Sequence, residues 1–226
     1  MDPEYYEIID GCRNNLIKHT IRAFEVLPGM HSPLVLDAGC GSGLPTLALL
    51  RCCAGTFHAA DTDPEALQRL RTRAGSLGLE ERISIMQASL FDEIFSPSSY
   101  DLVLAEGLLN AVGFERGLQR LRQLVKEDGY IIIHDELKDD PQKRKLFADY
   151  GLTLLDSFEL DRRIWWDQYY GCLENAIGQS GRPGLFSAEL RQIRMFREDP
   201  RRFCSIYYIL ETMTAAKNSD SRSAAV

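Results

Sequence analysis

Three glycines follow a short apolar run near the start of the chain. The run 34–38 ends in Asp37-Ala38, and the sequence Gly39-Cys40-Gly41-Ser42-Gly43 comes next. Glycine has no Cβ, so it accepts left-handed turns and lets a ligand approach the backbone closely. In α/β folds, a glycine loop between the first strand and the first helix often binds a nucleotide-like ligand. We therefore predict that residues 39–43 contact a ligand.

A second acid, Asp61, ends the next apolar run, 56–61. In nucleotide-binding α/β folds, an acid at the end of the second strand accepts hydrogen bonds from the ribose hydroxyls. An alternative is that Asp61 only caps the following helix. Asp63, directly before Pro64, is in the better capping position, so ribose binding by Asp61 is favoured.

Two other nucleotide-binding patterns do not fit the glycine loop. The dinucleotide pattern Gly-x-Gly-x-x-Gly needs a third glycine at position 44 or 46, where the chain has Leu44 and Thr46. The phosphate-binding pattern Gly-x-x-x-x-Gly-Lys-Ser/Thr is also absent from the sequence. A nicotinamide or flavin enzyme and an NTPase are therefore disfavoured.

The loop Asp-Ala-Gly-Cys-Gly-Ser-Gly resembles the signature of class I S-adenosylmethionine-dependent methyltransferases, and the resemblance extends from about Leu34 to His134. It implies that S-adenosylmethionine is the cofactor. The glycines would lie under its methionine end and ribose, Asp61 would bind the ribose hydroxyls, and Asp37 would lie near the methionine amino group. The residues implied in cofactor binding here are Asp37, Gly39, Cys40, Gly41, Gly43, Asp61 and Thr62.

The turn after the expected third strand, 82–88, departs from the family pattern. Many members have an acid there that binds the adenine amine, whereas this chain has Ser89. A hydroxyl can accept the same hydrogen bond, but it is weaker than a carboxylate by about 1 kcal/mol. We expect Ala88, Ser89 and Leu90 to line the adenine pocket.

Glu106 and His134 are the candidate catalytic residues, because each follows a central apolar run. The carboxyl ends of parallel strands face the ligand in an open α/β sheet, and either side chain could remove a proton from a methyl acceptor. In related methyltransferases the position of Glu106 contacts the methionine end or the acceptor. The alternatives are a structural or surface acid for Glu106 and a solvated side chain for His134.

The alternation of apolar runs and amphipathic segments predicts a doubly wound α/β fold with a mostly parallel sheet and helices on both faces. With the resemblance, we expect seven strands with the last one antiparallel. A single domain over 1–216 would include an N-terminal helical cap (1–30) and a helical insertion (160–202). The Ser/Ala-rich tail, 217–226, is expected to be disordered. The expected strands are 34–38, 56–61, 82–88, 100–105, 130–134, 152–158 and 203–210.

Several further segments resemble small-molecule methyltransferases related to the ubiquinone and menaquinone methylases. These are 105–107, 113–117, the aromatic stretch 165–170 and the last strand. The rings at Trp165 and Tyr169 have helical spacing and could pack a helix onto the sheet. Alternatively, they could form a lid that closes over the acceptor and excludes water.

The charge balance disfavours a nucleic-acid substrate, because 26 Lys and Arg stand against 33 Asp and Glu, a net charge of −7. Two basic groups, 69–73 and 143–145, are interpreted as solvated helix faces. We expect a small-molecule methyl acceptor, no nucleic acid and no stable membrane insertion, and the sequence permits a homodimer. The alternatives are a non-catalytic cofactor-binding scaffold and an RNA or protein methyltransferase.

The chain has 6 cysteines and no Cys-x-x-Cys pair. Without the spacing of a disulfide framework, a reduced, cytoplasmic protein is expected. Cys52 and Cys53 are adjacent and point in different directions from a helix, so they form a poor chelate, and no metal site is predicted.

Overall fold

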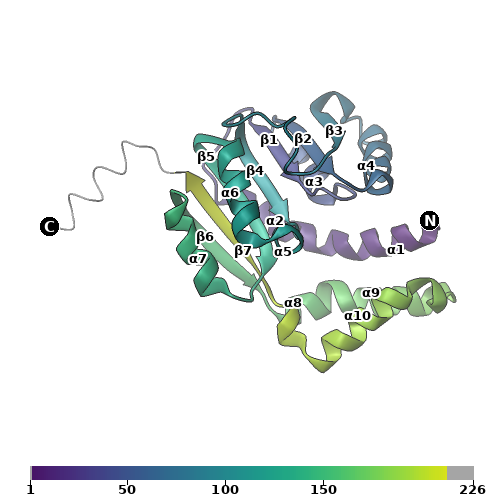
Figure 1. Ribbon diagram of the computed structural model, residues 1–226. Coiled ribbons are helices and arrows are strands. Elements are labelled where there is room, and N and C mark those ends of the chain that lie inside the picture. The colour runs from purple at the N-terminus through teal and green to yellow at the C-terminus, as the bar shows by residue number, and fades with distance from the viewer. Residues whose placement is uncertain (1, 213–226) are drawn as a thin grey trace.

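The computed structural model of the protein describes residues 2–212, so the predicted tail at 217–226 lies outside the described residues. One seven-stranded sheet forms the centre, in the order β3-β2-β1-β4-β5-β7-β6 (Figure 1). Strands β1 to β5 pair in parallel, and β7 lies antiparallel to both β5 and β6. The predicted fold class is confirmed. The strands are β1 Leu34–Ala38, β2 Thr56–Asp61, β3 Ile83–Gln87, β4 Tyr100–Glu106, β5 Val125–Glu136, β6 Leu152–Leu160 and β7 Ser205–Thr212.

Helices cover both faces of the sheet, because the central strands are apolar on both sides. On one face, side chains of α5, α6 and α7 pack on alternate strand residues such as Val103. On the other, α2, α3 and α4 pack on residues such as Leu102 and Leu104. The helices are α2 Ile17–Glu25, α3 Leu44–Cys52, α4 Pro64–Ser76, η2 Glu80–Arg82, α5 Leu109–Val112, α6 Phe114–Leu124 and α7 Asp140–Asp149.

The insertion between β6 and β7 forms a separate helical layer with α1 (Figure 1). Most of its aromatic side chains pack against α1 and not against the sheet. Tyr169, Tyr170 and Phe186 instead share a third core with Ile9 and Cys12 of α1, and Trp165 lies between this core and the sheet. The elements are α1 Pro3–Arg13, η1 Asn14–Leu16, α8 Arg162–Trp165, the π-helical η3 Trp166–Tyr170, α9 Gly171–Ser180, η4 Pro183–Phe186, α10 Ser187–Glu198 and η5 Pro200–Phe203.

Two local expectations need correction. The strand expected at 130–134 is longer in the structure, since β5 begins at Val125 and contains a bulge, where Asp128 has a φ of 59°. The expectation of wholly reduced cysteines is also wrong, since Cys12 of α1 and Cys172 of α9 form a disulfide. The two cysteines are 160 residues apart, so no local spacing could indicate the pairing.

Gly43 is required by both its conformation and its surroundings. Its φ is 74°, and a Cβ there would lie 2.2 Å from the Leu70 side chain of α4. We expect Gly43→Ala to lower the free energy of unfolding by roughly 2–4 kcal/mol, from overpacking plus left-handed strain. Gly181→Ala is the control, because Gly181 has a φ of 65° but open space around it. Urea denaturation should show a clearly larger loss for Gly43→Ala, and equal losses would contradict the clash.

Candidate functional site

The glycine loop is held against the end of β2. The N–H groups of Gly39 and Cys40 both donate to the carbonyl of Ala60, over 2.8 and 3.0 Å. Gly41 has a φ of 54° and nothing within 4 Å of where a Cβ would lie. At Gly41 the loop therefore presents bare backbone to an open space at the carboxyl ends of β1 and β2.

Asp61 joins the loop to the turn that follows β2. Its Oδ2 accepts the Gly41 N–H over 2.8 Å, and its Oδ1 accepts the Asp63 N–H over 2.9 Å. Asp63 caps α4 by accepting the Glu65 N–H, as predicted, so Asp61 is not the cap. A carboxylate has about four lone-pair sites, so half-buried Asp61 keeps acceptor capacity for hydroxyl groups beside Gly41.

Asp37 and Cys40 lie behind the loop rather than on its open side. Asp37 is buried, and its Oδ2 accepts a hydrogen bond from the Thr46 hydroxyl of α3. Burial raises the pKa of Asp37 to about 7. Burial also raises the pKa of the Cys40 thiol and so disfavours its thiolate form. Both residues fix the shape of the loop.

The turn after β3 has an acid, but not at Ser89. The Ser89 N–H donates to Asp92 Oδ2 over 2.9 Å, and the Ser89 hydroxyl accepts the Phe91 N–H over 3.3 Å. Ala88 and Leu90 are buried on either side, and the Ala88 N–H donates to the carbonyl of Asp61. The predicted adenine-side residues therefore adjoin Asp61. Thr62 is exposed at the next turn.

Helix α1 lies over the glycine loop and α4. Buried Asp10 accepts hydrogen bonds from Ser42 Oγ over 3.0 Å and from Arg73 Nη2 over 2.6 Å, and it lies 3.5 Å from Arg69. The prediction that 69–73 is a solvated helix face is therefore wrong in part, because Arg69 and Arg73 contact buried Asp10. The same correction applies to Lys143, which is buried in an ion pair with Asp135.

Glu106, at the end of β4, is held by two hydroxyl groups. Its Oε1 accepts from Thr20 Oγ1 of α2 over 2.7 Å and from the Tyr207 hydroxyl of β7 over 3.1 Å. Burial raises the pKa of Glu106 to about 7, and the nearby charge of Asp37 acts in the same direction. Such a carboxyl can gain and lose a proton near neutral pH, which is the property required of a general base.

His134, in register with Glu106 on β5 and with Tyr207 on β7, lies in an aromatic setting. The Tyr207 ring stacks on it at 4.2 Å between centroids, and burial lowers the pKa of His134 to about 3. Its Nε2 is 2.7 Å from Ser205 Oγ, which also accepts the Trp165 Nε1–H over 3.0 Å. We infer that Ser205 donates its proton to Nε2, so the neutral ring carries its own proton on Nδ1.

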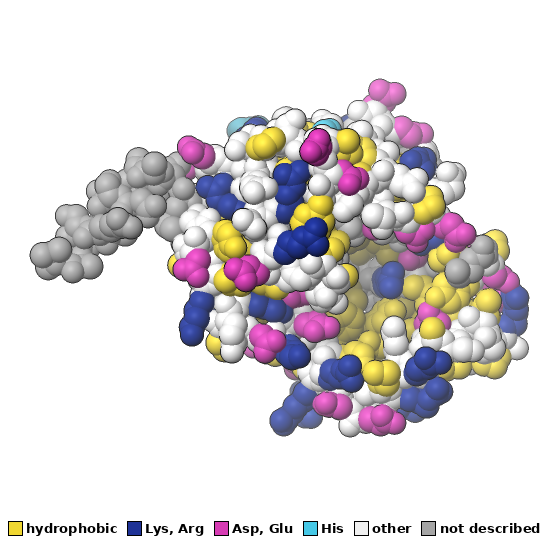
Figure 2. All heavy atoms as spheres, viewed as in Figure 1, with side chains coloured by type: hydrophobic (Ala, Val, Ile, Leu, Met, Phe, Trp, Pro, Cys, Tyr) yellow, Lys and Arg dark blue, Asp and Glu magenta, His cyan; other side chains and the backbone are white. Residues whose placement is uncertain are grey.

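A hollow lies between the sheet and the helical insertion, and apolar side chains line it (Figure 2).

Within the described residues 2–212, no three His, Cys, Asp or Glu side chains gather where they could hold a metal ion. No helix of that part of the chain combines the length and apolar character needed to cross a bilayer.

A family comparison agrees with this geometry: residues 35–129, from β1 to the bulge of β5, match the family described as "Methyltransferase domain". Residues 35–129 form a methyltransferase domain. The match contains the glycine loop, Asp61, the Ser89 turn and Glu106 but stops before His134 and the helical insertion. The layer formed by α1 and the insertion therefore lies outside the matched domain.

Two curated relatives resemble parts of this chain. A ribosomal protein L11 methyltransferase from Gloeobacter violaceus is 39% identical over 140 residues, which is 61% of this chain and 42% of the relative. A 2-phytyl-1,4-naphtoquinone methyltransferase from Trichormus variabilis is 28% identical over 120 residues, 52% of each chain. The match thus spans only about half the length of these relatives.

Solved structures share the fold over nearly the whole chain. The [4+2]-cyclase SpnF matches with a TM-score of 0.75 and 12% identity, over 88% of this chain and 82% of that one. A methyltransferase from Thiobacillus denitrificans, in complex with S-adenosyl-L-homocysteine, matches with a TM-score of 0.71 and 16% identity, over 93% and 99%. At such identities the likeness concerns the fold.

The sequence analysis did not identify the residues that contact Glu106 and His134. Thr20 of α2, Tyr207 and Ser205 of β7, and Trp165 of the insertion come from three distant segments. The available signals were a threonine in the expected N-terminal helical cap and an aromatic last strand. Neither signal indicates which side chain these residues would contact in the folded protein.

Proposed function

We propose that the protein transfers a methyl group from S-adenosylmethionine to a small-molecule acceptor. The observation that carries the proposal is the open space at Gly41 beside Asp61, at the carboxyl ends of β1 and β2. Bare backbone, a carboxylate with remaining lone pairs and the apolar Ala88 and Leu90 fit the methionine, ribose and adenine parts of this cofactor. When bound, the cofactor supplies an electrophilic methyl group on a sulfonium.

The two candidate catalytic residues take different roles in this proposal. Glu106, with a pKa of about 7, accepts the proton that an O–H or N–H acceptor loses. His134, with a pKa of about 3, is a poor base at neutral pH, and its Nδ1–H orients the acceptor as a hydrogen-bond donor. The remaining rate enhancement comes from positioning, which can contribute on the order of 7–11 kcal/mol.

An acceptor of small size is supported by the apolar hollow between sheet and insertion (Figure 2). Arg73 and Lys143 form ion pairs with Asp10 and Asp135, so less positive charge is available to bind a nucleic acid. A quinone methyltransferase among the relatives agrees with an apolar acceptor.

A protein acceptor is the second candidate, because several relatives, including the one from Gloeobacter violaceus, are named ribosomal protein L11 methyltransferases. The shared stretch covers 42% of that relative, so more than half of it has no counterpart in the comparison. A surface that would recognise a protein substrate is therefore not implied by the match.

We expect calorimetric titration to give micromolar binding of both S-adenosylmethionine and S-adenosylhomocysteine. Incubation with methyl-labelled cofactor should then label small molecules from a metabolite extract, and added ribosomal protein L11 should stay unlabelled. Labelled L11 would favour the second candidate. Binding without any labelling would favour a non-catalytic scaffold, and absence of binding would overturn the proposed function.

A further inference from the structure

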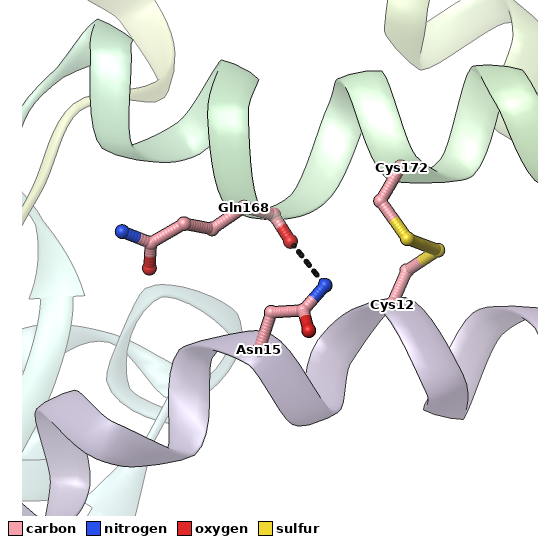
Figure 3. Close-up of a disulfide and its surroundings, with 4 residues drawn as sticks. All are labelled: Cys12, Asn15, Gln168 and Cys172. Atoms are coloured by element: carbon pink, nitrogen blue, oxygen red, sulfur yellow. Dashed lines mark hydrogen bonds between the residues drawn. A yellow bond between two sulfur atoms is a disulfide. The ribbon is translucent and has the colours of Figure 1, made fainter.

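One covalent bond joins the N-terminal helix to the helical insertion. Cys12 of α1 and Cys172 of α9 have Cα atoms 5.8 Å apart and form a disulfide, which we call the α1–α9 crosslink (Figure 3). Close to it, Asn15 Nδ2 donates to the carbonyl of Gln168 over 3.0 Å. Cys12 is 2% exposed, whereas Cys172 is half-buried. A small thiol can therefore reach the sulfur of Cys172 first.

Helix α1 also contacts the glycine loop. Asp10, close to Cys12 on α1, accepts the Ser42 hydroxyl of the glycine loop and pairs with Arg73 of α4. The Tyr5 hydroxyl of α1 donates to Glu189 of α10 over 2.5 Å. Helix α1 is therefore attached to the glycine loop on one side and to the insertion on the other.

Apart from the α1–α9 crosslink, the insertion is connected to the sheet through the two ends of its own chain segment. It leaves the sheet after Leu160 of β6 and returns at Ser205 of β7, and its apolar core is shared with α1 rather than with the sheet. A separation of the insertion from the sheet would pull on α1 through the α1–α9 crosslink. Through Asp10, it would also disturb the glycine loop.

We propose that the Cys12–Cys172 pair is a site of reversible thiol oxidation that controls how fast the nucleoside ligand enters and leaves the glycine loop. This inference rests on the proposed function. In the disulfide state, α1 and the insertion stay together over the site, and in the dithiol state they separate more often. Glutathione and its disulfide exchange with protein thiols and disulfides, so this redox couple can interconvert the two states.

The exchange with glutathione disulfide is balanced. The Cys172 thiolate attacks one sulfur of glutathione disulfide, and one glutathione thiolate leaves. The Cys12 thiolate then attacks the Cys172 sulfur and releases the second glutathione. The two cysteines are oxidised, glutathione disulfide is reduced by two electrons, and the two cysteine protons end on the glutathione thiols.

The test compares oxidised protein, protein reduced in a glutathione buffer, and Cys172→Ser. Alkylation after denaturation should find four free thiols in the oxidised form, since Cys40, Cys52, Cys53 and Cys204 are unpaired, and six in the reduced form. Stopped-flow dissociation of S-adenosylhomocysteine should be roughly 5- to 150-fold faster from the reduced protein and from Cys172→Ser. Cys204→Ser, which removes a free half-buried thiol, should keep the redox response.

Amide hydrogen exchange of α1 in ligand-free protein provides an independent readout. We expect faster exchange over Pro3–Arg13 in the reduced form and in Cys172→Ser. Equal dissociation rates in both redox states, or a native disulfide that glutathione cannot reduce, would overturn the inference. If neither form binds S-adenosylhomocysteine, the proposed function fails, and equal α1 exchange would then overturn the redox role separately.

Discussion

Replacing Asp61 with Ala should lower the affinity for S-adenosylmethionine roughly 10- to 150-fold, which corresponds to about 1.5–3 kcal/mol for hydrogen bonds to a charged acceptor. The carboxylate organises the loop by accepting the Gly41 and Asp63 N–H groups, and it would also accept the ribose hydroxyls. Both contributions are lost together in the variant. Calorimetric titration with cofactor and product measures the change.

Asp63→Ala is the matched control for this prediction. Asp63 lies beside Asp61 in the same turn but caps α4 through the Glu65 N–H. Its removal should lower stability by about 1 kcal/mol and leave the cofactor affinity within about twofold. Asp61→Ala with unchanged affinity and intact folding would place the ribose elsewhere.

Replacing Glu106 with Gln should lower the turnover number roughly 10²- to 10⁴-fold for an acceptor that loses a proton. Glutamine keeps the size of the side chain and can still accept hydrogen bonds from Thr20 and Tyr207, but it cannot take up a proton. The wild-type turnover number should rise with pH through about 7 and then level off, because the base is the deprotonated form. This rise should be absent in Glu106→Gln.

Thr20→Val tests the same role without touching the carboxyl itself. The Thr20 hydroxyl donates to Glu106 Oε1 and so favours the charged carboxylate. Its removal should raise the pKa of Glu106 further and move the rise in activity to higher pH. A wild-type turnover number in Glu106→Gln would show that Glu106 is not the base. Lost cofactor binding in that variant would instead make it a cofactor ligand.

The aromatic insertion illustrates why sequence patterns left alternatives open. Helical spacing of Trp165 and Tyr169 was compatible with a helix on the sheet and with a lid. The π-helical turn Trp166–Tyr170 alters that spacing, and the buried rings face α1 instead of the sheet. Periodicity indicates that a face is apolar, but it does not identify the surface that the face covers.

Local chemistry let the sequence by itself determine the position of the glycine loop, the Asp63 cap and the mostly parallel sheet implied by alternating segments. Tertiary structure alone decided the contacts of Glu106 with Thr20, of His134 with Ser205 and of Cys12 with Cys172. Their partners are 86, 71 and 160 residues apart. Such contacts depend on how strands β4, β5 and β7 and helices α1, α2 and α9 pack together. That packing cannot be predicted from any short stretch of the sequence.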